Sequence, residues 1–63
     1  MNNDKEKAAI AAAFEQQIGQ MYTVLLLALA QDSANTEGSR QRFAKGIALA
    51  RQARDLAIKI ISE

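Results

Sequence analysis

The chain has 63 residues, with eight basic against seven acidic residues and no cysteine, histidine or proline. It therefore has no disulfides and lacks the usual ligands of zinc, haem and iron–sulfur clusters. A chain of about 60 residues buries only ~60% of its unfolded surface, and small folds without disulfides or metals usually depend on oligomerisation. We expect a single domain over residues 1–63, without cofactors, and the absence of cysteine favours a cytoplasmic location.

The first predicted element is a helix over residues 4–31. Its apolar residues recur every three or four positions, which is the period of one helix face. This stripe consists of Ile10, Phe14, Ile18, Met21, Leu25 and Ala28. Asn3 is expected to cap the helix through its side chain, with Glu6 at the N3 position of a capping box.

The second half of this helix, residues 21–30, is apolar nearly all the way round. A membrane-spanning helix needs ~20 apolar residues, so this stretch of about ten is too short, and we expect no membrane partner. A helix that is apolar on more than one face needs more than one partner. Leu26 and Leu27 point away from the Phe14 stripe, and Tyr22 lies beside it. They are expected to be buried in a homodimer or to form a docking groove for a different protein.

Residues 32–39 are rich in Asp, Ser, Asn and Gly, which favour turns, and this segment is predicted to be a loop. Ser39 or Thr36 could cap the next helix, and Ser39 is favoured because Gly38 is a poor helix residue. The second helix is predicted over residues 40–61. Its inner face combines Phe43, Ile47 and Ile61 with the small residues Gly46, Ala50, Ala53 and Ala57.

The small residues of the second helix allow the first helix to approach closely, so that its large side chains fill the gaps. A second apolar edge of the same helix carries Leu49, Leu56 and Ile60. Both helices therefore need two partners. An all-α antiparallel hairpin that dimerises into a four-helix bundle satisfies both of them.

Basic residues are concentrated in the second helix, where residues 40–63 hold six of the eight basic and two of the seven acidic residues. Arg40, Arg42 and Lys45 crowd its first turns, where the helix dipole disfavours cations. Charge placed there indicates an acidic target, either a protein surface or an RNA or DNA backbone. Nucleic acid is the less favoured target, because the net charge is only +1 and few aromatic residues could stack on bases.

Arg54 falls inside the apolar arc of the second helix. A bare buried guanidinium costs several kcal/mol, so this side chain must be paired or reach water. We expect it either to extend to water at the edge of the bundle or to form an ion pair with Glu15 or a C-terminal carboxylate. The alternative is that Arg54 anchors a partner protein, since arginine is enriched among binding hot spots.

Catalysis is not expected, because the chain has no histidine base, no cysteine nucleophile and no glycine-rich phosphate loop. The leading interpretation is a small regulatory or adaptor protein that binds a host or partner protein as well as itself. The predicted partner-binding residues are Tyr22, Leu26, Leu27, Arg40, Arg42, Lys45, Leu49, Arg54 and Leu56.

In length and architecture, the predicted hairpin resembles the Rop-type plasmid RNA-binding hairpins and the small hairpin proteins of phages and mobile elements. No residue motif of either group is matched, so no functional residue is carried over. The resemblance implies that the adaptor is an accessory protein of a phage or mobile element. It also implies one alternative to the protein-binding adaptor, namely a Rop-like RNA-binding four-helix-bundle regulator. A purely structural assembly subunit is a further alternative.

Overall fold

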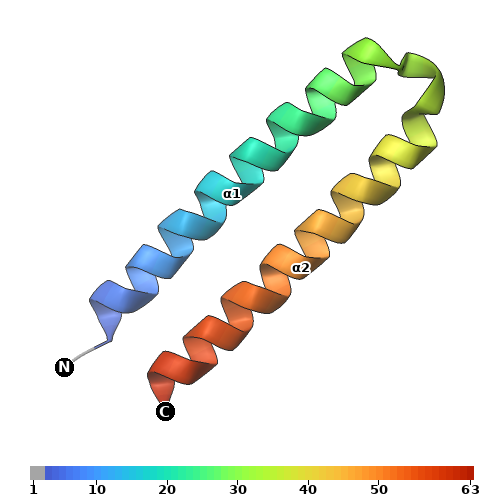
Figure 1. Ribbon diagram of the computed structural model, residues 1–63. Coiled ribbons are helices and arrows are strands. Elements are labelled where there is room, and N and C mark those ends of the chain that lie inside the picture. Colours follow the sequence, from blue (N-terminus) through green and yellow to red (C-terminus); the bar gives the residue numbers. More distant parts are fainter. Residues whose placement is uncertain (1–2) are drawn as a thin grey trace.

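The computed structural model describes residues 3–63, and these form a helical hairpin (Figure 1). Helix α1 spans Asp4–Gln31, a short 3-10 turn η1 spans Ser33–Asn35, and helix α2 spans Thr36–Ser62. The two long helices run antiparallel, so the start of α1 and the end of α2 lie at one end of the hairpin and the connection lies at the other (Figure 1). The predicted all-helical hairpin is confirmed.

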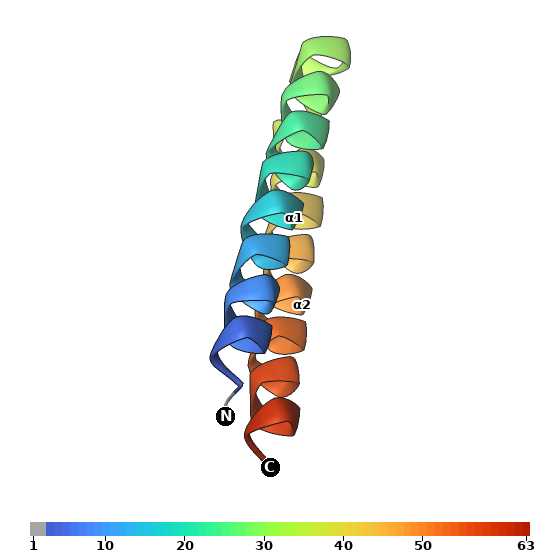
Figure 2. The same cartoon turned by 90° about the vertical axis from the view of Figure 1, so that its left-hand side faces the viewer.

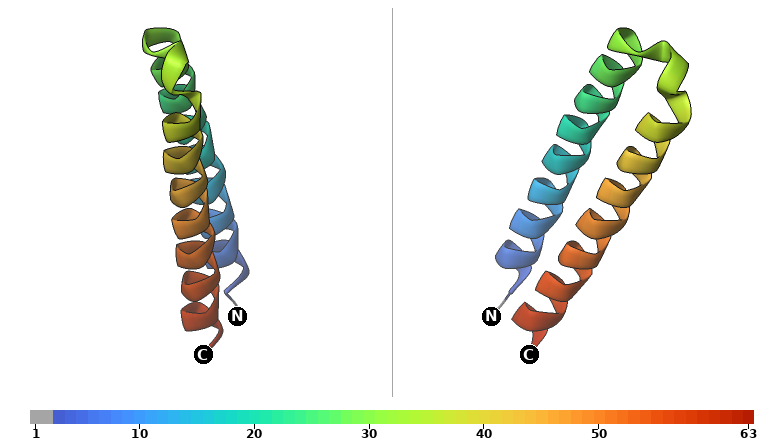
Figure 3. Two further views of the ribbon diagram at one scale, coloured as in Figure 1. Left: turned by 90° about the vertical axis from the view of Figure 1, so that its right-hand side faces the viewer. Right: turned by 45° about the vertical axis from the view of Figure 1, so that its right-hand side comes forward.

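The hairpin is a single flat layer of two helices. Its Cα atoms extend over 51 × 15 × 6 Å, and views along the layer show one helix behind the other (Figures 2 and 3). Each helix packs against the other along one side only, so both broad faces of the layer are open. Among the described residues no apolar side chain is buried, and the one buried residue is Ser39, which is 3% exposed.

Helix α1 begins and ends where the apolar pattern predicts. The six residues of the Phe14 stripe are all half-buried, whereas almost every other position of the helix is exposed. The stripe therefore forms the contact with α2, as its period indicates. Because α2 packs against one side of this stripe, the contact shields these side chains without enclosing them.

The predicted cap of α1 is wrong in its chemistry. Asn3 occupies the N-cap position, but its side chain accepts no hydrogen bond from the first turn. Instead its Nδ2 donates to the carbonyl oxygen of Ile61, at 3.0 Å. The last turn of α2 lies beside the start of α1 in the hairpin, and this contact between distant parts of the chain draws the side chain away from local capping.

The predicted start of α2 is also wrong, because the helix begins at Thr36 and not at residue 40. Its N-cap is Asn35, whose side-chain oxygen accepts a hydrogen bond from the backbone N–H of Gly38 at 3.3 Å. A Cβ atom at Gly38 would lie 2.6 Å from that oxygen, so the glycine makes room for the cap. Ser39, the expected cap, lies inside the helix and is buried against α1.

The two helices approach closely at Gly46. A Cβ atom at this position would lie 2.9 Å from the sulfur of Met21 on α1. This contact matches the prediction that small residues of the second helix accommodate large residues of the first. Within the described part of the chain, neither helix combines the length and apolar character that crossing a membrane requires.

Candidate protein-interaction surface

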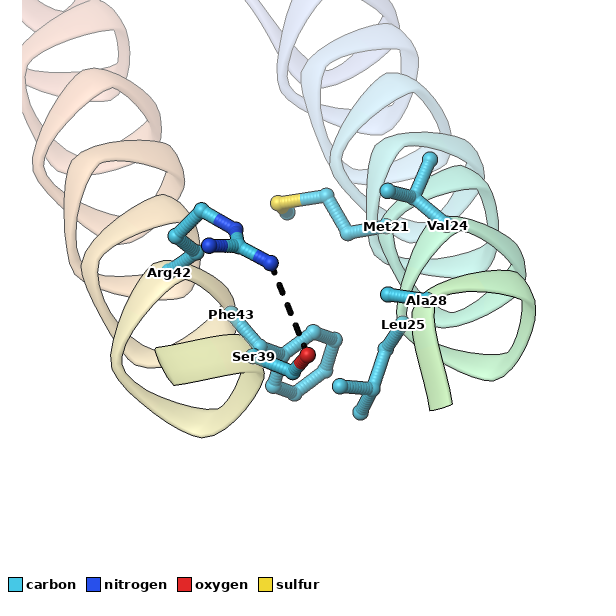
Figure 4. Close-up of a pocket in the computed structure, with 7 residues that line it drawn as sticks. All are labelled: Met21, Val24, Leu25, Ala28, Ser39, Arg42 and Phe43. Atoms are coloured by element: carbon cyan, nitrogen blue, oxygen red, sulfur yellow. Dashed lines mark hydrogen bonds between the residues drawn. The ribbon is translucent and has the colours of Figure 1, made fainter. Parts of the chain in front are cut away.

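An apolar groove runs along one face of the hairpin, between α1 and α2. It consists of two hollows of about 510 Å³ and 200 Å³ that share Met21. The larger hollow is lined by Ile10, Ala13, Phe14, Gln17, Met21, Gly46, Leu49, Ala50, Ala53, Arg54 and Ala57. The smaller hollow, drawn in Figure 4, is lined by Met21, Val24, Leu25, Ala28, Ser39, Arg42 and Phe43.

The spacing of the lining residues places both hollows on the same face of the layer. On α1, Val24 of the smaller hollow lies seven residues after Gln17 of the larger one. On α2, Leu49 of the larger hollow lies seven residues after Arg42 of the smaller one. Residues seven apart point in nearly the same direction from a helix, about two turns along. The hollows therefore form one continuous groove, and the face that carries it is called here the groove face.

The groove face has a floor of small residues and a rim of large ones. The floor contains Gly46, Ala50, Ala53 and Ala57 of α2. The rim contains Leu49, 57% exposed, and Val24, 65% exposed. Leu56 lies one heptad after Leu49, and Leu27 lies three residues after Val24, so helix geometry places both on this side too. These large side chains remain exposed beside the floor of small residues.

A second, smaller apolar surface lies on the opposite side of the hairpin. Tyr22 and Leu26 are 59% and 54% exposed. Each lies two residues from Val24, which corresponds to roughly 160° around the helix axis, so they point away from the groove. This pair is called here the Tyr22 face. The structure therefore divides the predicted apolar site residues between two surfaces, with Leu27, Leu49 and Leu56 toward the groove side.

The three cations predicted to bind a partner, Arg40, Arg42 and Lys45, are divided between the two faces in the same way. Arg42 lines the groove, and one of its terminal nitrogens donates to the Ser39 hydroxyl at 3.5 Å (Figure 4). Lys45 lies three residues farther along, on the groove side of the exposed surface. Arg40 lies two residues before Arg42 and so points roughly 160° away from it. The three cations therefore form no single patch.

Arg40 is already paired within its own helix. It forms an ion pair with Glu37, and its Nε donates to Glu37 Oε1 at 3.1 Å. Gln41 Nε2 donates to the same carboxylate at 3.3 Å. The hydrogen bond from Arg40 holds the pKa of the Glu37 carboxyl below its ordinary value, and the same bond raises the pKa of Arg40. This acidic residue in the first turn offsets the unfavourable position of the cation.

Arg54 lies where the sequence places it, at the edge of the apolar stripe, and it reaches water there as expected, but its ion-pair partner is not one of the predicted ones. Its guanidinium carbon lies 4.5 Å from the centre of the Phe14 ring. Its Nε donates to Asp55 Oδ1 at 3.0 Å, in place of Glu15 or a C-terminal carboxylate. The side chain is 32% exposed, so the charge reaches water while the aliphatic stem covers the larger hollow.

Two exposed residues of the groove side, Val24 and Ile60, were not among the predicted partner-binding residues, although the sequence places Ile60 on the second apolar edge of α2. The signal that could have identified them is spacing, since Val24 follows Gln17 by one heptad and Ile60 follows Leu56 by one turn.

No group of acidic residues among residues 3–63 is arranged to hold a metal ion. No family model matches the chain, and no curated protein or solved structure matches it either.

Proposed function

We propose that this chain is a small non-enzymatic regulator or adaptor that works by binding other protein chains through both faces of its helical hairpin. The observation that carries the proposal is the exposure of seven large apolar side chains, between 54% and 65%, on a layer only one helix thick. Full burial of such a side chain stabilises by roughly 1.5–3 kcal/mol. Within residues 3–63 no third helix covers them, so their burial calls for a second chain.

The two-faced shape favours an adaptor over a protein that only associates with itself. One partner laid on a flat layer covers one face. The groove face and the Tyr22 face point in opposite directions, so covering the groove leaves Tyr22 and Leu26 exposed. Tyrosine is suited to a target-binding role, because its ring supplies apolar area and its hydroxyl supplies a hydrogen bond.

The Rop-like RNA-binding alternative receives less support from the arrangement of charges. Such binding depends on cations aligned along a phosphate backbone. Arg40 is paired with Glu37 and points away from Arg42. RNA binding would show itself as an affinity that falls steeply with salt and with removal of Arg42 and Lys45. Binding that is absent or insensitive to salt would exclude it.

The test of the proposed function uses two matched variants, Leu26→Glu on the Tyr22 face and Leu56→Glu on the groove side. The two leucines are 54% and 55% exposed, so both substitutions introduce a charge at a similarly solvent-exposed position. The tagged chain is purified from cells that express it natively. We expect one stoichiometric partner protein that Leu26→Glu loses, while this variant keeps its helicity. Recovery of no stoichiometric partner would contradict the proposal.

A further inference from the structure

We propose that the groove face binds a second copy of this chain, with the two connecting turns at opposite ends and with the Leu49 side chains meeting near the two-fold axis. This inference deepens the proposed function, on which it rests, because it names the partner of one face. It leaves the Tyr22 face free for the target protein.

The groove face is self-complementary. Its large residue Leu49 and its small residues Gly46, Ala53 and Ala57 all line the larger hollow. A two-fold dimer brings the same patch of both chains together, so each Leu49 lies beside its counterpart and within one helical turn of the small residues Gly46 and Ala53 of the other chain. Alternation of large and small residues across facing positions is what lets two helical layers interdigitate. A single chain leaves the hollow of about 510 Å³ unfilled.

The size of the groove face suits a stable dimer. The layer extends over 51 × 15 Å. Side chains included, such a face offers on the order of 800 Å² per copy, which is the area that each partner of a standard stable interface buries. The buried area would also supply the apolar core that the isolated hairpin lacks, since no apolar residue of the described chain is buried. Association of this kind is the usual route by which a short chain without disulfides becomes stable.

The placement of charge favours connecting turns at opposite ends. Arg42 lies at the turn end of the groove face and Lys45 lies one turn farther along α2. Turns at the same end would gather these cations from both copies at one end of the bundle. Turns at opposite ends separate the two pairs of cations. Each pair then lies toward the end of the other copy that carries Glu6 and the groove-lining Arg54, whose charge is already paired with Asp55. Glu6 lies one turn before Ile10, which lines the groove, so it points to the same side.

The groove itself locates the two-fold axis. Along α2 its lining runs from Ser39 to Ala57, and the midpoint of this range falls beside Leu49. With turns at opposite ends, α2 lies across α2 of the second copy, so the two Leu49 side chains face each other. With turns at the same end, α2 lies across α1 of the second copy. Leu49 would then face Gln17, because both residues line the same hollow at the same height.

The test uses Leu49→Cys in the full chain, which has no cysteine of its own. A disulfide forms only when the two Cα atoms lie about 4.4–6.8 Å apart. Because each chain carries a single thiol, a disulfide between two chains shows that residue 49 of one copy lies close to residue 49 of the other. Leu26→Cys on the Tyr22 face is the matched control. We expect Leu49→Cys to form disulfide-linked dimers under mild oxidation at least ~10-fold faster than Leu26→Cys. Sedimentation equilibrium of the reduced protein should give the mass of a dimer.

Three results would overturn the inference. Equal cross-linking rates for Leu49→Cys and Leu26→Cys would show that the Leu49 side chains do not meet at the two-fold axis. Faster cross-linking in a mixture of Gln17→Cys and Leu49→Cys chains than in Leu49→Cys alone would place the turns at the same end. A monomer mass for the wild-type chain would exclude the second copy altogether. Leu49→Glu provides a check without any disulfide, because the charge at the axis should abolish the dimer mass.

These outcomes are distinct from a failure of the proposed function. The recovery of a target protein by the wild-type chain, and its loss in Leu26→Glu, depends on the Tyr22 face and not on the geometry of the groove. A chain that is monomeric but retains a stoichiometric target contradicts only the second-copy inference. A chain that dimerises through Leu49 but retains no target contradicts only the adaptor proposal.

Discussion

The two helical glycines, Gly46 and Gly19, offer a direct measure of how closely the helices approach. Replacing a glycine in a helix interior by alanine stabilises the helix by about 1 kcal/mol, because alanine loses less backbone entropy. A Cβ atom at Gly19 meets nothing within 4 Å, so Gly19→Ala should show the whole gain per chain. A Cβ atom at Gly46 would lie 2.9 Å from the sulfur of Met21, so Gly46→Ala gains the same propensity and also displaces this side chain.

The difference between the two substitutions is therefore the cost of moving Met21. A methionine is flexible, but overpacking at a close contact typically costs 1–3 kcal/mol. We expect Gly46→Ala to be neutral or destabilising in the wild-type chain. In a Met21→Ala background the contact is absent, and Gly46→Ala should there recover its gain of about 1 kcal/mol.

The assay is chemical denaturation followed by helical circular dichroism, at one fixed chain concentration because association shifts apparent stability. Gly19→Ala calibrates the propensity gain, and the four combinations of Gly46→Ala and Met21→Ala form a double-mutant cycle. A gain at Gly46 equal to that at Gly19 in the wild-type chain would refute the reasoning, since the helices would then not be in contact at this point.

Three further substitutions test contacts of the hairpin. Asn35→Ala removes the α2 cap and should cost about 1 kcal/mol in denaturation experiments. Arg54→Gln removes the cation over the Phe14 ring, and the loss should be about 0.5–1 kcal/mol, measured in the same way. The hydrogen bond from Arg40 lowers the pKa of Glu37, so this pair stabilises the fold above pH ~4.3 and loses its effect as pH falls through the lower folded pKa. A pH series of thermal midpoints should show this dependence, reduced in Glu37→Gln.

Each of these has its own control. Ser39→Ala should have a smaller effect on the α2 start than the cap substitution, because Ser39 does not cap the helix; the reverse order would contradict the assigned cap. Asp55→Asn removes the ion pair of Arg54 but leaves its contact with Phe14, so an effect as large as that of Arg54→Gln would attribute the stability to the pair. An unchanged pH dependence in Glu37→Gln would contradict the role of that carboxyl.

The sequence indicates which residue types form the candidate surface, but not that these residues are divided between the groove face and the Tyr22 face. The sequence indicates surplus apolar residues on both helices, and Tyr22, Leu26, Leu27, Leu49 and Leu56 are all at least half exposed in the hairpin. What the sequence left open is which of them share a face. A helical wheel gives the direction of a side chain relative to its own axis. Only the packing of α1 on α2 says which sides of the two helices meet at one surface.

The sequence by itself determined the two helices and the stripe that joins them. Period-three-and-four apolar spacing from Ile10 to Ala28 needs no tertiary information, because it follows from the geometry of a single helix, and α1 ends where that spacing ends. The absence of helix breakers other than a short polar segment between residues 32 and 39 likewise fixed the hairpin.

Tertiary structure decided where α2 begins and which neighbours individual side chains have. Ser39 and Asn35 are both good caps in isolation, and packing against α1 chose between them by burying Ser39. The Asn3 side chain had a local acceptor role available, but the end of α2 offered the carbonyl oxygen of Ile61 within reach. Local sequence gives each polar group a set of possible partners. The fold selects among them, because it alone brings residues 58 positions apart into contact.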